Sequence, residues 1–328
     1  MILIVFHDSS RMREGFQFVV LQSTIDFNDI FEGHHPTMTV GLHCRLLKGC
    51  ERMRTDVIGR VSFANCDPLF HGLDPKWKVL PAPPSWLTGH LLRGECLIAP
   101  IPMADLARNA DTLCAIDSIG IASDGGVGSV LLFGDCPVEE MRDIAVPTDS
   151  STSRTLLPWL LSERGFRPRL IEMGPNLESM LERCDGALLI GDRAIHHAHL
   201  QPDLVRMDLG DEWLDITDMP MVFGVFCARQ DADTTAVSCA ISDLEGALSR
   251  FENEPLFRQE VIARSAKVTR FSVGRMETYF GSEVRNRLTP KDRASMQRFA
   301  TDVCGLEGEV PWWVDNQSEP VNRRNAAS

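Results

Sequence analysis

The stretch that most constrains the fold is residues 57–73, VIGRVSFANCDPLFHGL, because it is typical of a strand that runs directly into a helix. Residues 57–63 are rich in β-branched and aromatic types, which favours a strand. Pro68 lacks an N–H and suits a first helical turn, so Asn65 and Asp67 lie where the strand ends and the helix begins. In open α/β sheets ligands bind at such strand ends, next to helix N-termini. The two side chains either contact a ligand or only cap the turn, and the local pattern leaves both open.

The composition limits the classes of partner. The chain has 328 residues, 44% hydrophobic and 24% charged, which is typical of a globular protein with room for two domains. Its net charge of −13 argues against nucleic acid or an anionic membrane surface as a partner. The ten cysteines form no CxxC pair, which indicates buried thiols in a reducing compartment. No apolar run approaches the roughly 20 residues that span a bilayer, and no signal-peptide cleavage site is evident. We therefore expect a cytoplasmic protein.

Strand-like runs alternate with helices in the middle of the chain. CLIAPIP, VGSVLLFG, IAVP, RLIEM, GALLIGD and MVFGVFCAR are the strand-like runs, and the helices between them have about ten residues. This alternation predicts an α/β fold with parallel sheets covered by helices on both faces. From Ser242 onward the pattern is helical, with Glu245 at the spacing of a capping box and a later helix beginning at Thr289-Pro290.

The two ends of the chain differ from this middle part. Residues 1–56 show no sustained hydrophobic period, so they are expected to form a weakly ordered N-terminal extension, or translation begins at Met53 instead. Residues 307–328 are polar apart from Trp312-Trp313 and are expected to form a flexible tail.

Several separated segments, in order and in spacing, resemble the chorismate dehydratases of the futalosine route to menaquinone. They are RVSFANCDPLFHGL, IASDGGVGSVLLF, STSRTLLPWLL and ALLIGDRAI, the last followed by DLGDEWLDITDMPMVFGVF, and the resemblance covers about residues 57–305. It implies the two-lobed α/β fold of type II periplasmic binding proteins, with parallel or mixed sheets and a helical C-terminal segment. Residues 57–146 plus 236–306 would form lobe one, and residues 147–235 lobe two. Asp67 departs from the family's uncharged residue, and we interpret it as a helix N-terminal acid that faces away from the substrate.

The resemblance implies a carbon–oxygen lyase that dehydrates chorismate to 3-[(1-carboxyvinyl)oxy]benzoate. Loss of the C4 hydroxyl and the C3 proton makes the ring aromatic, so the reaction needs neither cofactor nor metal. The enzyme must hold a dianion and stabilise the charge that develops as the C3 proton leaves. No general base stands out in the sequence, so the enolpyruvyl carboxylate of the substrate is one hypothesis for the base.

Polar side chains at strand ends and helix starts, most of them hydrogen-bond donors, are the candidate site residues. The catalytic candidates are Asn65, Ser123 and Asp192, and the substrate-binding candidates are Ser62, Asp124, Ser151, Thr152, Ser153, Arg154 and Thr155. Arg154 either clamps a carboxylate or points to solvent or to an acid. Asp192 either binds the hydroxyl or transfers a proton, or it only caps the helix that follows.

Other features receive structural interpretations. His196, His197 and His199 lack a partner at metal-ligand spacing, so no metal is expected. Cys66 is interpreted as a passive thiol and Tyr279 as core or hinge packing. Competing functions are a non-enzymatic small-anion binding protein, the sister enzyme 1,4-dihydroxy-6-naphthoate synthase and a ligand-sensing domain. The sequence shows no export signal that would favour the binding protein and no histidine in a motif that matches the sister enzyme. It also shows no helix-turn-helix segment that would favour the sensing domain. Pairing into a homodimer is left open.

Overall fold

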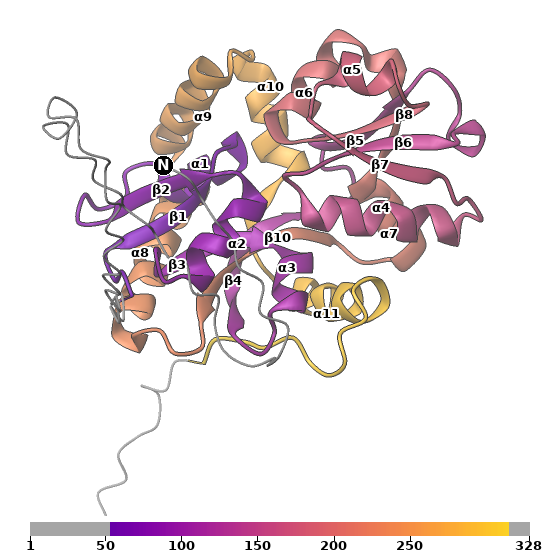
Figure 1. Cartoon of the computed structure of the whole chain (residues 1–328). Coiled ribbons are helices and arrows are strands. Elements are labelled where there is room, and N and C mark those ends of the chain that lie inside the picture. Colours follow the sequence, from indigo (N-terminus) through magenta and orange to yellow (C-terminus); the bar gives the residue numbers. More distant parts are fainter. Residues whose placement is uncertain (1–52, 315–328) are drawn as a thin grey trace, which may run out of the picture. The chain divides into compact units, whose positions relative to one another are not determined.

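Two mixed β-sheets, each covered by helices, make up the part of the chain that the structure describes (Figure 1). The structure is a computed structural model, and it describes residues 53–314. Most of the predicted N-terminal extension and the end of the predicted tail lie outside these residues. The α/β fold predicted from the alternation of strands and helices is confirmed, but the sheets are mixed rather than parallel, because β10 in the first sheet and β5 in the second pair with antiparallel neighbours.

The first sheet has six strands in the order β11-β4-β10-β3-β1-β2. β1 pairs in parallel with β2 and β3, whereas β10 runs antiparallel to both β3 and β4. Its strands are β1 (Val57–Val61), β2 (Lys78–Ala82), β3 (Ile98–Pro102), β4 (Leu113–Ser123), β10 (Met221–Arg229) and β11 (Arg285–Arg287). Its helices include η2 (Ala64–Cys66), α1 (Asp67–Phe70), α2 (Pro84–Leu92) and α3 (Met103–Arg108). We call this sheet and its helices the first lobe.

The second sheet has five strands in the order β7-β6-β8-β5-β9, and with its helices it forms the second lobe. The strands are β5 (Val130–Gly134), β6 (Asp143–Pro147), β7 (Arg169–Met173), β8 (Gly186–Ile190) and β9 (Val205–Asp208). Helices α5 (Leu177–Leu181) and α6 (Gly191–Leu200) lie on one side of the sheet, and α4 (Ser151–Glu163) and α7 (Leu209–Thr217) lie on the other (Figure 1). Short turns η3 (Val138–Glu140) and η4 (Pro202–Leu204) complete this lobe.

The chain crosses between the two sheets twice, at residues 124–129 and at residues 218–220. The predicted lobe boundaries lay near 147 and 235. The crossings follow β4 and α7, so β5 and β6 pair in the second sheet and β10 pairs in the first. The alternation of strands and helices shows that strands exist but does not show which sheet each one joins. Buried Asp208 ties the first crossing to the start of α7, because its carboxylate accepts backbone N–H bonds from Val127 at 3.1 Å, Gly128 at 2.7 Å and Gly210 at 2.8 Å.

The C-terminal part returns to the first lobe, and two predictions about it are wrong. Helix α8 (Thr234–Asn253) begins at an Asp233 cap that accepts from Ala236 N, so Ser242 lies within the helix rather than at its start. The segment is also not purely helical, because β11 interrupts it. The remaining elements are α9 (Pro255–Thr269), α10 (Val273–Thr278), η5 (Tyr279–Glu283), α11 (Pro290–Arg298) and η6 (Phe299–Val303). Thr289 and Asp292 form the capping box at the start of α11.

The predicted flexible tail begins with an ordered segment that pairs with the first sheet. Ala115 N donates to Pro311 O at 2.8 Å, and Trp313 N donates to Ala115 O at 2.7 Å. These bonds satisfy backbone groups of β4 that would otherwise face solvent. The prediction of a flexible tail is therefore wrong for residues 307–314, and residues 315–328 lie outside the described residues.

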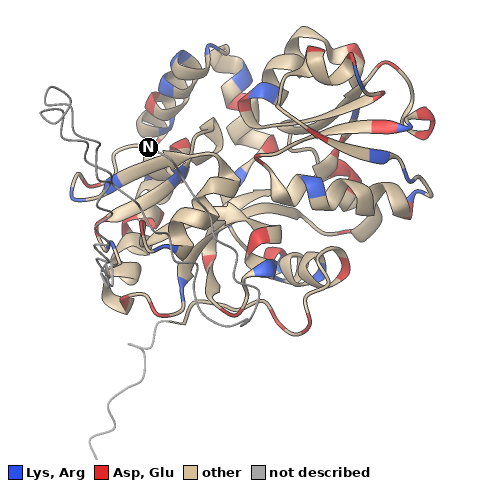
Figure 2. Ribbon diagram, in the orientation of Figure 1, with Lys and Arg blue, Asp and Glu red and all other residues tan. Residues whose placement is uncertain are grey.

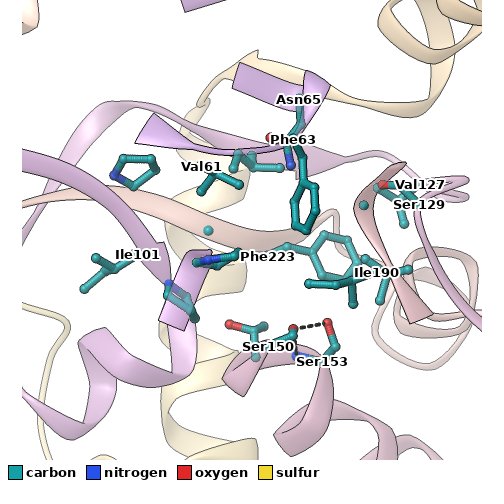
Figure 3. A pocket seen from close by; sticks show the side chains of 18 residues that line it. Val61, Phe63, Asn65, Ile101, Val127, Ser129, Ser150, Ser153, Ile190 and Phe223 are labelled. Carbon is teal, nitrogen blue, oxygen red and sulfur yellow. Dashed lines mark hydrogen bonds between the residues drawn. The ribbon is translucent and has the colours of Figure 1, made fainter. Parts of the chain in front are cut away.

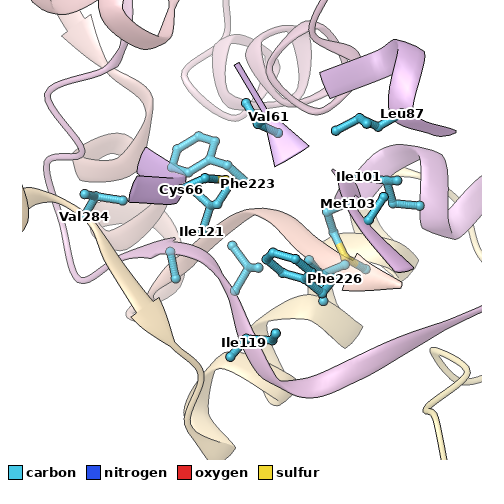
Figure 4. Packing of buried hydrophobic residues seen from close by; sticks show 14 of the residues in the cluster. Val61, Cys66, Leu87, Ile101, Met103, Ile119, Ile121, Phe223, Phe226 and Val284 are labelled. Atoms are coloured by element: carbon cyan, nitrogen blue, oxygen red, sulfur yellow. The ribbon is translucent and has the colours of Figure 1, made fainter. Parts of the chain in front are cut away.

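A continuous hydrophobic core lies under the first sheet and extends to the edge of the site. Ile101, Ile121 and Phe226 from three neighbouring strands pack together, and Val61 and Phe223 continue the packing toward the strand ends (Figure 4). Full burial of each such side chain stabilises the fold by about 1.5–3 kcal/mol. None of the helices in residues 53–314 is long and apolar enough to cross a membrane. In Figure 2, acidic and basic residues are mixed over the helices and loops, and neither sign gathers into a patch in this view.

Candidate functional site

A cavity lies where strand ends of the two lobes meet. The first lobe contributes Val61, Phe63 and Asn65 after β1, Ile101 in β3 and Phe223 in β10, whereas the second contributes the loop before β5, the start of α4 and the end of β8 (Figure 3). Its empty volume is about 520 Å³, including the part open to solvent.

The lining of the cavity is apolar with a small set of neutral polar groups. Asn65 lies on one side, and Ser150 and Ser153 lie on the opposite side (Figure 3). Ser129 and Thr152 are the other polar residues of the lining. Among the described residues, no Asp, Glu, His, Cys, Lys or Arg lines the cavity. The site can therefore orient a ligand through hydroxyl, amide and backbone groups, but its lining contains no side chain with the pKa of a general base.

The turn that carries Asn65 is held from two directions. Its backbone carbonyl accepts a hydrogen bond from Asn286 Nδ2 at 2.9 Å, and the same amide donates to Gly120 O at 2.9 Å. The Asn65 side chain is only 8% exposed, and its Oδ1 has no hydrogen-bond partner within the protein. A buried polar atom without a partner costs about 1–3 kcal/mol, so a ligand that supplies a partner would recover this free energy.

The start of α4 presents free N–H groups and hydroxyls to the cavity. Ser150 is the N-cap, and its Oγ accepts from Ser153 N at 3.4 Å and bonds Ser153 Oγ at 2.8 Å. The first N–H groups of a helix have no intrahelical partner, and the helix dipole adds positive potential there. This end of α4 can therefore bind a carboxylate without a charged side chain. Thr152 Oγ1 accepts from Ala104 N of the first lobe at 3.3 Å, which joins the lobes beside the cavity.

Asp192 holds the Asn65 turn but does not line the cavity. β8 ends at Ile190, so Asp192 lies in the first turn of α6 rather than at a strand end. Its carboxylate accepts from Ala64 N at 3.1 Å, across the boundary between the lobes. Burial raises the pKa of Asp192 to about 6, although this hydrogen bond acts in the opposite direction. The preceding Gly191 has φ +61° and packs under the ring of Phe63, where a Cβ atom would lie 2.6 Å from Phe63 Cγ.

The structure brings only part of the predicted site together. Asn65, Thr152 and Ser153 line the cavity. Buried Ser123 and Ser151 lie outside the lining, and neither of their hydroxyls has a partner within the protein.

The remaining predicted substrate-binding side chains have other surroundings. Ser62 is exposed to solvent. Arg154 pairs with Glu172, which is one of the two arrangements that the sequence left open. Asp124 pairs with Arg285, and Thr155 bonds Ser151 O and Arg108. None of these side chains lines the cavity.

Two hydroxyls and two aromatic rings of the lining were missed by the sequence analysis. Ser150 stands one residue before the predicted serine-threonine cluster, and its position as an N-cap was the available signal. Ser129 follows a glycine-rich run that has no periodic pattern. Phe63 and Phe223 belong to strand-like runs, where an aromatic residue is more often a core residue.

Asp67 and Cys66 lie close to Asn65 in the chain, but their side chains have structural surroundings. Asp67 pairs with Arg60 and accepts from Ser265 Oγ at 2.5 Å, and it is absent from the cavity lining. Cys66 is fully buried, and this burial raises the pKa of its thiol to about 12, which keeps it protonated. Within residues 53–314 no group of three His, Cys, Asp or Glu side chains is placed to hold a metal ion.

Comparison with known proteins agrees with this geometry. A family profile described as menaquinone biosynthesis matches residues 57–303, which include both lobes. The chain belongs to this menaquinone biosynthesis family. The chorismate dehydratase of Thermus thermophilus is 34% identical over 195 residues, which cover 55% of this chain and 72% of that relative. The family places this chain among the enzymes of menaquinone biosynthesis.

Solved structures show the same fold. A protein of Archaeoglobus fulgidus aligns with a TM-score of 0.60 at 17% identity, covering 76% of this chain and 98% of its own. The periplasmic aliphatic sulphonate binding protein of Escherichia coli aligns with a TM-score of 0.53 at 16% identity, covering 82% and 97%. The two-lobed periplasmic-binding-protein-like fold inferred from the sequence is therefore confirmed.

Proposed function

We propose that this enzyme is a hydro-lyase that dehydrates chorismate to 3-[(1-carboxyvinyl)oxy]benzoate in the futalosine route to menaquinone. The observation that carries the proposal is a cavity whose polar lining consists of hydroxyls and one amide, in a chain of the menaquinone biosynthesis family. The similarity to the Thermus thermophilus chorismate dehydratase supports chorismate as the substrate.

The two sides of the cavity suit the two ends of the reacting ring. The start of α4, with Ser150 and Ser153, would bind the ring carboxylate, and Asn65 on the opposite side would bind the C4 hydroxyl. The rings of Phe63 and Phe223 and the aliphatic side chains beside them provide an apolar surface for the cyclohexadiene. Polar groups at both ends of an apolar cavity hold the substrate in a single pose.

Placing the ring carboxylate at α4 explains how the C3 proton becomes acidic. The C3–H bond is vinylogous to that carboxylate, so negative charge spreads onto the carboxylate oxygens as the proton leaves. Helix N–H groups and serine hydroxyls stabilise this charge without reorganising, because they are already fixed by the fold. The electron pair of the C3–H bond then forms the C3–C4 double bond as the C4 oxygen departs, and the ring becomes aromatic.

The proton acceptor in this proposal is the substrate itself. No ionisable side chain of the described residues lines the cavity, and Asp192 is engaged by Ala64 N outside the lining. The enolpyruvyl carboxylate is joined through its ether oxygen to C3 and can reach the C3 proton. The C3 proton passes to this carboxylate and, with the departing C4 hydroxide, leaves as water.

The experiment is to incubate the purified protein with chorismate alone and to follow the aromatic product by proton NMR. Turnover without any added cofactor supports the proposal. Asn65→Ala should abolish turnover, whereas Ser62→Ala, a matched control on the same turn with an exposed hydroxyl, should keep it. Binding of chorismate without turnover would indicate a binding protein, and absence of binding would reject chorismate as the ligand.

A further inference from the structure

One hydroxyl that lines the cavity is hydrogen-bonded to a buried hydroxyl from the opposite lobe. Ser129 comes from the loop that enters the second lobe and lines the cavity, and Tyr279 comes from η5 of the first lobe. The Tyr279 hydroxyl donates to Ser129 Oγ at 3.2 Å. These two residues are 150 positions apart in the chain, so only the fold brings them together.

The pair is buried and fixed on both sides. Tyr279 is 0% exposed and Ser129 is 4% exposed. The ring of Tyr279 packs against Phe280 at a centroid distance of 5.4 Å, and Arg275 lies 5.7 Å from the ring centroid. Ser129 O accepts from Gly191 N at 2.7 Å, which fixes the backbone of the serine. Neither side chain has room to change its position freely.

The direction of this hydrogen bond decides what Ser129 can offer to a ligand. A phenol in these surroundings keeps its proton, because burial raises the pKa of Tyr279 well above its ordinary value. In the geometry of the pair Ser129 Oγ accepts from the Tyr279 hydroxyl, and its own hydrogen remains available. Within the described residues Ser129 Oγ has no other hydrogen-bond partner. The serine hydroxyl can then donate to a ligand oxygen in the cavity.

We propose that Tyr279 is a positioning residue that sets Ser129 as a hydrogen-bond donor to an oxygen of the bound substrate. This inference rests on the proposed function for the identity of the substrate, but the hydroxyl pair itself does not depend on it. Tyr279 acts entirely through Ser129, so removal of the phenol hydroxyl matters only while the serine hydroxyl is present.

A double-mutant cycle tests this dependence. Tyr279→Phe keeps the buried ring and should lower kcat/KM for chorismate by about 2- to 10-fold, the range expected for one hydrogen bond. Ser129→Ala should lower it by at least as much. The double variant should be no worse than Ser129→Ala alone. Ser282→Ala, which removes an exposed hydroxyl within the same η5 segment, is the matched control and should leave kcat/KM unchanged.

Two outcomes would overturn the inference. One is a Tyr279→Phe variant with unchanged kcat/KM, and the other is a double variant in which the two losses multiply, because Tyr279 would then act independently of Ser129. The same cycle is measured by calorimetry with 3-methoxybenzoate, which has the aromatic carboxylate and ring ether of the product. This binding measurement requires no turnover, so a protein that binds the probe but does not dehydrate chorismate would reject the proposed function and still test the pair.

Discussion

Replacing Asp192 by Asn should make the protein more stable at neutral pH, by an amount that grows as the pH rises. The Asp192 carboxyl is partly buried in the first turn of α6, and this burial raises its pKa from 3.8 to about 6. Asparagine has the same shape and keeps an oxygen that can accept from Ala64 N, but it carries no charge to desolvate.

The sign and the size of this stability change follow from the raised pKa of Asp192. Between pH 3.8 and about 6 the folded protein binds more protons at this site than the unfolded chain, so the carboxyl's contribution to stability falls as the pH rises through this window. The pKa rises from 3.8 to about 6 on folding, and a pKa difference of one corresponds to about 1.4 kcal/mol. The stability lost is therefore at most about 3 kcal/mol. Below the window a protonated Asp192 and an asparagine should be nearly equivalent.

The assay is thermal unfolding of the wild type and Asp192→Asn at pH 4, 5, 6 and 7.5. The Tm of the variant should rise relative to the wild type by several degrees over this range and change little above about pH 6.5. Asp203→Asn, which alters an exposed aspartate of the same lobe, is the control and should show no such trend. A difference that is flat, or that favours the wild type as the pH rises, would refute the reasoning, because the carboxylate would then be stabilised in its charged form.

Three further perturbations test other parts of the structure. Gly191→Ala should lower the free energy of unfolding by roughly 1–2 kcal/mol, because alanine is strained in the left-handed backbone conformation. It should also raise KM, because the new Cβ atom displaces Phe63 from the cavity. The Tm measures the first effect and steady-state kinetics the second. Thr152→Val should leave the Ala104 N–H without its acceptor, which lowers the free energy of unfolding by about 1–3 kcal/mol. It should also raise KM more than it lowers kcat. Equal effects on KM and kcat would contradict a role of Thr152 in joining the lobes. Ending the chain after Gly308 should lower Tm by removing the bonds of Pro311 and Trp313 to β4, and an unchanged Tm would show that this segment contributes nothing to stability.

Local signals in the sequence were sufficient for much of the fold and for one end of the site. The strand–turn–helix pattern of residues 57–73 placed Asn65 at the cavity, and the serine-threonine run placed the start of α4 there. Each signal spans only a few consecutive residues, so periodicity and capping preferences can reveal it. The prediction that Tyr279 is buried is also confirmed.

The parts that were missed depend on pairings between distant residues. The hydrogen bond between Tyr279 and Ser129 joins the two lobes, and the contact of Asp192 with Ala64 N spans 128 positions of the chain. The lobe boundaries were misplaced for the same reason, since a buried apolar strand such as β5 fits either sheet until its neighbours are known. Sequence periodicity carries no information about these pairings.

The most direct test of the proposed mechanism is a crystal structure with 3-[(1-carboxyvinyl)oxy]benzoate bound. The account predicts the ring between Phe63 and Phe223, its carboxylate against the first N–H groups of α4 and Ser153, and Asn65 beside the carbon that carried the lost hydroxyl. It also predicts the enolpyruvyl carboxylate folded toward C3. A product bound outside this cavity, or a carboxylate or imidazole of the protein in contact with C3, would contradict the account.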